Sequence, residues 1–153
     1  MKLRTCAFTT VILVAAALPA FAQTDRKNIV LDRTPAEQAT SPWSDAVLVG
    51  NTLYLSGFVG ADPKTMAVPA SAEQETRLAM DDMKRTVEAA GMTMDDLVIV
   101  HVLGTDLNLF KTFNTVYKIY FHGGFPARTF TGASKLLLGA HFEITGIAIK
   151  RGK

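Results

Sequence analysis

Cysteine is almost absent from this chain of 153 residues, in which Cys6 is the single example. Cys6 lies in an N-terminal stretch with the pattern of a removable targeting signal. The mature chain would therefore have no thiol and no disulfide, which excludes cysteine catalysis. Its stability must come from packing or from assembly with other copies.

Residues 1–22 match a secretory signal peptide. Lys2 and Arg4 supply the basic start, residues 11–18 the apolar core, and Ala-Phe-Ala ends the segment as a small-x-small cleavage site. The apolar run is short for a membrane span, which needs about 20 residues. A buried N-terminal helix is the structural alternative. We expect cleavage after Ala22, a periplasmic or secreted protein, and no membrane association after cleavage.

Neither an excess of one charge nor a run of like charges is present. The chain has 16 Lys and Arg against 14 Asp and Glu, and loss of Lys2 and Arg4 with the signal leaves 14 against 14. A near-neutral protein lacks the positive field that attracts polyanions. We therefore expect no nucleic acid as the main partner.

Motifs for metal, phosphate and nucleophile sites are also missing. His101, His122 and His141 stand far apart without ligand spacing, so we expect no metal site. Gly123-Gly124 follows a predicted helix instead of opening one, so it is not a phosphate loop. Ser56 lacks the glycine that precedes the serine of a nucleophile elbow. No cofactor is expected.

The hydrophobic pattern predicts a single domain over residues 41–153, after a leader and a short edge strand in 23–40. Apolar residues recur at helical spacing in two stretches, and Gly50-Asn51 between two apolar runs predicts a β-hairpin. The predicted elements are strands at 28–31, 46–49, 53–55, 97–103, 125–130 and 141–149, helices at 71–90 and 108–121, and a loop at 34–42.

This order, β-β-β-α-β-α-β-β, predicts an α+β fold with one sheet and two helices on one face. In the last strand, Phe142 and Ile144 point to one face of the sheet, and Ile147 and Ile149 point to the other. No element remains in the chain to cover the second face. We infer that another copy covers it, so that the protein is a homo-oligomer and its sites can lie between subunits.

Arg128 and Glu143 are single charged residues in the two final strands, which we expect to be neighbours in the sheet. Spacing alone favours a cross-strand salt bridge over a function. The functional alternative is that the Arg128 guanidinium grips a carboxylate while Glu143 handles a water molecule. Asn114, on the apolar stripe of the second helix, is either a satisfied core amide or a group that lines a pocket.

Several short motifs follow one another over about residues 40–151. They are Leu53-Tyr54-Leu55-Ser56-Gly57, Asp62-Pro63-Lys64-Thr65, Glu88-Ala89-Ala90-Gly91, Asp106-Leu107-Asn108, Phe113-Asn114 with Tyr117, Pro126-Ala127-Arg128 and Phe142-Glu143-Ile144. Together they resemble the RidA family, also called YjgF/YER057c/UK114. The match is specific because several separate motifs occur in the right order.

The resemblance implies a chorismate-mutase-like fold, βββαβαββ, assembled as a homotrimer with a cleft between each pair of subunits. It also implies hydrolysis of reactive enamines and imines, such as 2-aminoacrylate, to 2-oxo acids and ammonia without cofactor or metal. By resemblance, Arg128 binds the substrate carboxylate and Glu143 positions or activates the attacking water. Ser56, Gly57 and Asn114 match positions that line the site.

Three positions depart from the family pattern. Trp43 stands where a tyrosine is usual, so it can cover the ligand but lacks the phenol. Phe130 stands where the best-characterised members carry cysteine, and Thr145 replaces a second acidic residue. We expect Trp43 and Phe130 to contact the substrate. These changes should alter the size of the substrate and the rate more than the type of reaction.

Two other functions stay open. The chain could bind small carboxylates such as 2-oxo acids without turnover, or protect other exported proteins as a holdase. Ribonuclease activity, a label that some relatives carry, is disfavoured by the near-neutral charge of the mature chain and by export.

Overall fold

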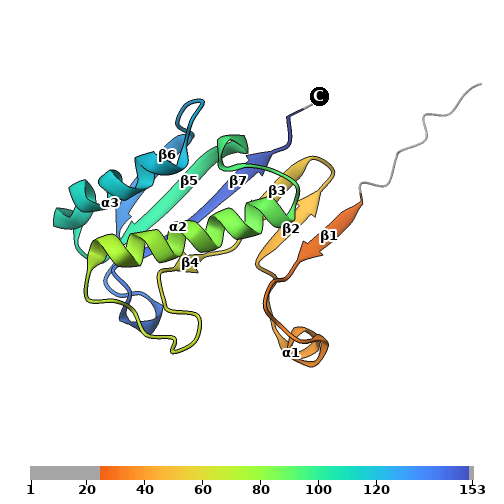
Figure 1. Cartoon of the computed structure of the whole chain (residues 1–153), viewed down its shortest axis with the longest axis horizontal. Coiled ribbons are helices and arrows are strands. Elements are labelled where there is room, and N and C mark those ends of the chain that lie inside the picture. Colours follow the sequence, from red (N-terminus) through yellow and green to blue (C-terminus); the bar gives the residue numbers. More distant parts are fainter. Residues whose placement is uncertain (1–24, 152–153) are drawn as a thin grey trace, which may run out of the picture.

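The computed structural model describes residues 25–151, and the predicted signal peptide at 1–22 lies outside them. One mixed sheet of seven strands has the order β1-β2-β3-β7-β5-β6, with β4 paired to β7 (Figure 1). All pairs are antiparallel except β5 with β6. The elements are β1 Arg26–Ile29, α1 Pro35–Thr40, β2 Ala46–Val49, β3 Thr52–Leu55, β4 Phe58–Val59, α2 Ala72–Ala89, β5 Leu97–Gly104, α3 Phe110–Tyr117, β6 Ala127–Gly132 and β7 Phe142–Ile149.

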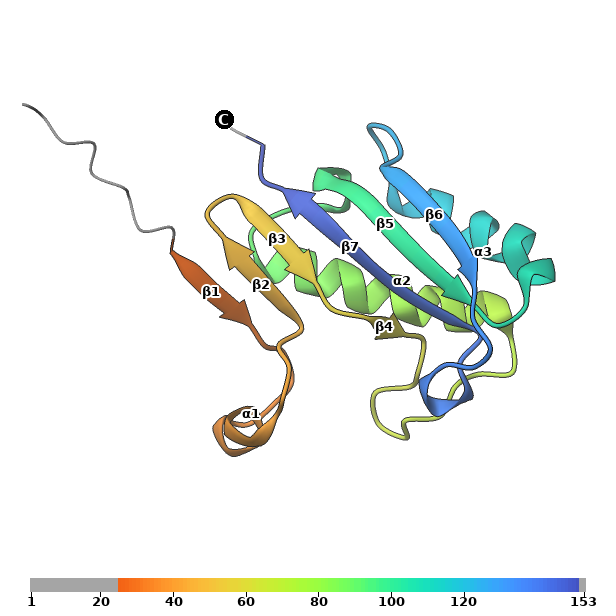
Figure 2. The ribbon, with the colours of Figure 1, turned by 180° about the vertical axis from the view of Figure 1, so that it is seen from behind.

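Both long helices cover the same face of the sheet, and the view from behind shows the strands without a helix in front of them (Figure 2). The predicted α+β class and its single covered face are therefore confirmed. α2 begins where the sequence indicates, because the Ser71 side chain accepts a hydrogen bond from the Gln74 N–H. None of the helices within residues 25–151 is long and apolar enough to cross a membrane.

The last strand shows how the two faces differ. In β7, Phe142, Ile144 and Ala148 are fully buried, whereas Glu143 and Ile147 are only half-buried. The buried set packs with α2 and α3 residues, including Met80, Met83, Val87 and Phe113, in one core. The alternation expected for the final strand is thus confirmed, and the opposite face keeps apolar side chains such as Ile149 exposed to solvent.

The segment expected to be a loop at 34–42 contains α1 instead, so that prediction was wrong. Thr34 and Glu37 form a capping box, with the Thr34 N–H 2.7 Å from Glu37 Oε2. Pro35 occupies the first turn, where a missing N–H costs no hydrogen bond. A proline that looked like a helix breaker therefore starts a helix.

Two further elements differ from expectation. The chain adds the two-residue strand β4, which pairs with β7. The predicted helix 108–121 is α-helical only at α3, and 3₁₀ turns at Leu107–Leu109 and Lys118–Tyr120 extend it at both ends.

The expectation that the two final strands are neighbours was also wrong, because β5 lies between them. Arg128 on β6 pairs with Val100, and Glu143 on β7 pairs with Leu103. Paired residues lie on the same face of a sheet, and successive residues of one strand alternate between the two faces. The two partners, Val100 and Leu103, are three positions apart on β5, so Arg128 and Glu143 lie on opposite faces of the sheet. The helical crossover from β5 through α3 makes β6 the parallel neighbour of β5, and β7 then returns on its other side. A cross-strand salt bridge within one subunit is excluded.

A buried carboxylate fixes the start of β7, and with it the place of Glu143. The fully buried Glu75 on α2 accepts three hydrogen bonds. Its Oε1 takes the N–H groups of His141 and Phe142, at 2.7 and 2.8 Å, and its Oε2 lies 2.6 Å from His141 Nδ1. The Glu75 side chain therefore links α2 to the start of β7, the strand that carries Glu143.

We expect Glu75→Ala to lower the free energy of unfolding by about 3 kcal/mol, because two backbone N–H groups lose their acceptor inside the core. Glu75→Gln should cost below about 1 kcal/mol, since a single amide oxygen can accept from both N–H groups. Urea unfolding of the two variants beside the parent protein measures the difference. Equal destabilisation by alanine and glutamine would show that the charge, and not the hydrogen bonds, stabilises the fold.

Candidate functional site

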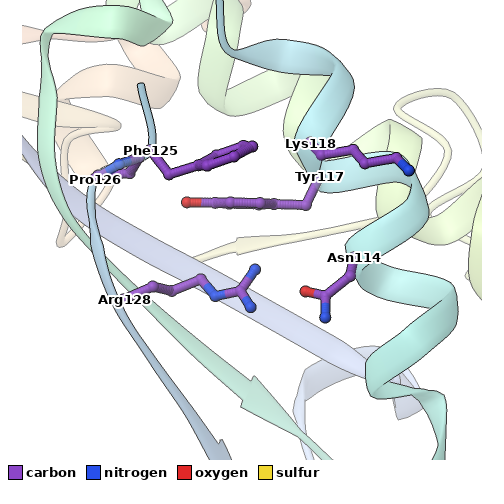
Figure 3. Close-up of a pocket in the computed structure, with 6 residues that line it drawn as sticks. All are labelled: Asn114, Tyr117, Lys118, Phe125, Pro126 and Arg128. Carbon is purple, nitrogen blue, oxygen red and sulfur yellow. The ribbon is translucent and has the colours of Figure 1, made fainter. Parts of the chain in front are cut away.

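A cavity of about 400 Å³ opens between α3 and the start of β6. It is lined by Asn114, Tyr117, Lys118, Phe125, Pro126 and Arg128 (Figure 3). The helix supplies the first two of these residues, and the segment that enters β6 supplies the last three. The β5–α3–β6 crossover therefore forms the cavity, because it packs the helix over the strand that follows it.

Arg128 reaches into this cavity with an unpaired charge. Its Cζ lies 4.5 Å from the ring centre of Tyr117, 5.6 Å from that of Phe110 and 5.8 Å from that of Phe113. No ion pair within residues 25–151 includes Arg128. A half-buried guanidinium that contacts only ring faces has the charge and the forked N–H donors that suit an anion.

Two buried polar atoms beside Arg128 also have no hydrogen-bond partner among the described residues: Asn114 Oδ1 and the Tyr117 hydroxyl. Figure 3 shows the Asn114 amide pointing towards the guanidinium. The alternative of a satisfied core amide at Asn114 therefore fails, and its oxygen is left to line the cavity. Burial raises the pKa of Tyr117 to about 12, against the opposing effect of the Arg128 charge, so its hydroxyl stays neutral at pH 7.

The sequence predicts Tyr117 only as one more apolar residue of the helix stripe and does not identify it as a site residue. Its hydroxyl was the available signal, because a tyrosine on a face that packs against a sheet must find a partner for its O–H. The neighbouring Tyr120 does so, donating to Asp81 Oδ1 at 2.6 Å. The Tyr117 hydroxyl has no such partner among the described residues, and this distinguishes Tyr117 as a residue of the cavity.

Glu143 belongs to a second cluster, at the break between β3 and β4. A Cβ added at Gly57 would overlap Glu143 Oε1 and lie 3.0 Å from its Cδ, so the carboxylate rests directly on the Gly57 backbone. Ser56 Oγ donates to the Ser44 carbonyl at 2.6 Å, and Thr145 Oγ1 donates to the Leu55 carbonyl at 2.7 Å. Ser56, Gly57 and Glu143 are thus brought together as one small group.

Neither Trp43 nor Phe130 is among the residues that line the cavity. Trp43 is 60% exposed, one residue from the Ser44 carbonyl that holds Ser56, and its ring lies 5.3 Å from the Arg33 guanidinium. Phe130 instead packs edge-on against Phe110 and Phe113, with ring centres 5.1 and 5.5 Å apart. Within one subunit, Phe130 supports the rings around Arg128 and does not line the cavity.

The two clusters cannot act on one small molecule inside a single subunit. Arg128 and Glu143 are separated by two strand spacings and three residues along the sheet, or about 14 Å between Cα atoms, and they point to opposite faces. No group of three His, Cys, Asp or Glu side chains within residues 25–151 could hold a metal ion. The fold and the site together define a small α+β protein in which the cavity around Arg128 and the carboxylate cluster of Glu143 lie on opposite faces of one sheet.

The family model described as Endoribonuclease L-PSP matches residues 33–150, and the chain belongs to this family, the RidA/YjgF family. The chain is 38% identical over 122 residues to the 2-iminobutanoate/2-iminopropanoate deaminase of Mus musculus, an alignment that covers 79% of this chain and 90% of that protein.

Two solved structures from Escherichia coli resemble the fold. The crystal structure of the YjgF gene product has a TM-score of 0.73 and 36% identity, over 82% of this chain and 99% of that one. The structure of TdcF with bound serine has a TM-score of 0.69 and 32% identity, over 72% and 91%. Residues 33–150, which the family model matches, include both clusters.

Proposed function

We propose that this protein hydrolyses reactive imines and enamines derived from amino acids to 2-oxo acids and ammonia. The observation that carries the proposal is the Arg128 guanidinium, which lies in a cavity without an acidic partner among the described residues. Such a group suits the carboxylate that these substrates share. A relative at 38% identity is named for this reaction, with 2-iminobutanoate and 2-iminopropanoate as substrates.

We further propose that the working form is a homotrimer in which Arg128 of one subunit and Glu143 of the next complete one site. The face of the sheet that carries Glu143 also presents apolar side chains such as Ile147 and Ile149 and has no helix over it. Another copy would bury that apolar surface. The same contact would bring a neighbour's cavity towards Glu143, which one subunit cannot do.

In the assembled site, Arg128 and the Asn114 amide hold the carboxylate end of the substrate. The carbon of a protonated C=N group is already electrophilic, so the protein mainly has to position water and accept its proton. The Glu143 carboxylate takes that proton as the water oxygen bonds to the carbon. Protonated Glu143 returns the proton to the nitrogen of the resulting carbinolamine, the C–N bond breaks to release ammonia, and the hydroxyl loses its proton as the carbonyl forms. An enamine becomes the protonated imine once its terminal carbon has been protonated, and it is then hydrolysed in the same way.

Coupling the purified protein to an enzyme that generates 2-aminoacrylate tests the reaction directly. We expect faster release of ammonia and pyruvate than in buffer alone. The absence of any acceleration across several amino-acid-derived imines would contradict the proposal. RNA should be included as a substrate, because RNA cleavage that survived both Arg128→Ala and Glu143→Gln would point to a contaminating nuclease.

A second candidate function is binding of small carboxylates without turnover. The structure of TdcF holds serine, a small amino acid, and that protein covers 72% of this chain. Crystals soaked with 2-oxobutanoate, combined with the ammonia assay, separate the two functions. Density for a carboxylate at Arg128 together with no turnover would favour a binding module.

Gly57→Ala is expected to lower kcat about 10²-fold, because the added methyl group would displace the Glu143 carboxylate from its place on the backbone. The free energy of unfolding should change by less than about 1 kcal/mol, since the carboxylate end of a flexible side chain can swing aside. Gly123→Ala is the matched control, because its Cβ would meet nothing closer than 3.9 Å. Full activity of Gly57→Ala would remove Glu143 from the proposed role.

We also propose that the protein acts in the periplasm or outside the cell, after removal of residues 1–22. The basic start, the apolar core and the small-x-small site of that segment support this placement. The N-terminal sequence of protein recovered from a periplasmic extract would test it.

A further inference from the structure

The way in which Arg128 is held is unusual for a half-buried arginine. Such a side chain normally pairs with a carboxylate, because an isolated charge is costly to remove from water. Arg33 in this chain does so, with Nη2 2.7 Å from Asp45 Oδ1. Around Arg128 the rings of Phe110, Phe113 and Tyr117, here called the aromatic cage, take the place of the acid.

Tyr117 has the closest ring of the cage and is itself held firmly. The guanidinium lies against one face of this ring and Phe125 lies against the other (Figure 3). The ring centres of Tyr117 and Phe125 are 6.4 Å apart with planes 24° from parallel, and Phe121 packs at 4.7 Å. The ring is therefore a supported platform for the guanidinium.

We propose that Tyr117 is a positioning residue for Arg128, which its ring holds flat so that the N–H edge of the guanidinium meets the substrate carboxylate. This inference rests on the proposed role of Arg128. Attraction by the ring face stabilises the cation without neutralising it, whereas an acidic partner would compete with the substrate. The ring and not the hydroxyl is the part of Tyr117 that holds the guanidinium, because Arg128 Cζ lies 4.5 Å from the ring centre, against the face of the ring (Figure 3).

Phe130 gains a place in this arrangement. It lies edge-on to both Phe110 and Phe113, so it supports two rings of the aromatic cage from behind. Gly104 makes room for it, because a Cβ there would lie 3.0 Å from Phe130 Cε1. A phenylalanine at this position therefore fits a role in holding the rings of the aromatic cage in place, without contacting the substrate itself.

The test separates the ring of Tyr117 from its hydroxyl. Tyr117→Leu should weaken binding of 2-oxobutanoate about tenfold by calorimetry and raise KM by a similar factor, with kcat within about twofold. Tyr117→Phe keeps the ring, so its Kd should stay within about twofold of the parent protein, and its melting temperature should not fall. Tyr120→Leu is the control, since it removes a tyrosine that bonds to Asp81 and does not line the cavity.

A double-mutant cycle distinguishes positioning from a general structural effect. In an Arg128→Met background, Tyr117→Leu should leave the residual affinity unchanged, because there is no guanidinium left to position. If Tyr117→Leu does not fold, Phe110→Leu gives a second measurement. Phe110 is 42% exposed and its ring is further from the guanidinium, so a two- to threefold weakening of binding is expected.

Each outcome decides between the proposals. Equal loss of affinity in Tyr117→Phe and Tyr117→Leu would mean that the hydroxyl contacts the ligand, which overturns the positioning role. Binding that disappears in Arg128→Met but is unchanged in Tyr117→Leu would overturn this inference and leave the proposed function intact. A parent protein that neither binds 2-oxobutanoate nor turns over an imine would overturn both.

Discussion

Arg128→Ala is expected to lower kcat/KM for amino-acid-derived imines by about 10³-fold. A carboxylate on a guanidinium fork accepts two charge-assisted hydrogen bonds, each contributing roughly 1.5–3 kcal/mol. Losing both raises the free energy of the bound transition state by about 4 kcal/mol, which corresponds to that factor. The fold should survive, because no acidic side chain within residues 25–151 pairs with Arg128 and would be left unpartnered.

Steady-state assays and thermal unfolding of the same preparation measure the two parts of this prediction. Arg85→Ala is a suitable control, since Arg85 on α2 pairs with Asp82 of the same helix and with Asp32 of the segment between β1 and α1, and none of these residues lines the cavity. It should keep full activity. Turnover that persists in Arg128→Ala at more than a tenth of the parent rate would mean that another group binds the carboxylate.

Two inactive variants are expected to recover activity when they assemble together. Glu143→Gln removes the acceptor for the proton of the attacking water and should by itself cost about 10²–10⁴-fold. Arg128→Ala subunits still have Glu143, and Glu143→Gln subunits still have Arg128. If each site takes one residue from each of two subunits, a random equal mixture has an intact site at about a quarter of its interfaces.

Co-expression of the two variants with different tags, followed by purification over both, gives the mixed oligomers. We expect up to about a third of the parent activity per site, because every trimer that contains both variants has one intact site among its three interfaces, against almost none for either variant alone. Mixing the separately purified proteins without exchange of subunits is the control and should stay inactive. Mixed oligomers that remain inactive, or a parent protein that sediments as a monomer at micromolar concentration, would contradict the shared site.

Local chemistry made a large part of the fold predictable. The α2 helix begins at the serine cap that the sequence shows, and the β7 alternation follows from the two-residue period of a strand. Predictions from local sequence failed where one residue type can either end a helix or begin one. Pro35 starts a helix although it usually breaks one, because its position within the first turn decides the effect.

The site was predictable as a set of residues but not as an arrangement. Arg128 and Glu143 are each the one charged side chain of an apolar strand, which is visible without coordinates. The distance between them is not visible in the sequence, because β6 and β7 follow each other along the chain but pair with opposite edges of β5. The missing partners of Tyr117 and Asn114 are likewise a property of packing, since only the surrounding atoms decide whether a polar group is satisfied.

The pattern of residues alone therefore determined the class of fold, the family, and the presence of a second apolar sheet face, because periodicity and capping act over a few residues. Tertiary structure decided that Arg128 lies in an aromatic cage on the helix side while Glu143 rests on Gly57 on the other side. The physical reason is that the face on which a side chain lies depends both on its odd or even position along its strand and on how that strand pairs with its neighbours. The odd or even position can be counted along the sequence, whereas the order of the strands exists only once distant strands have paired.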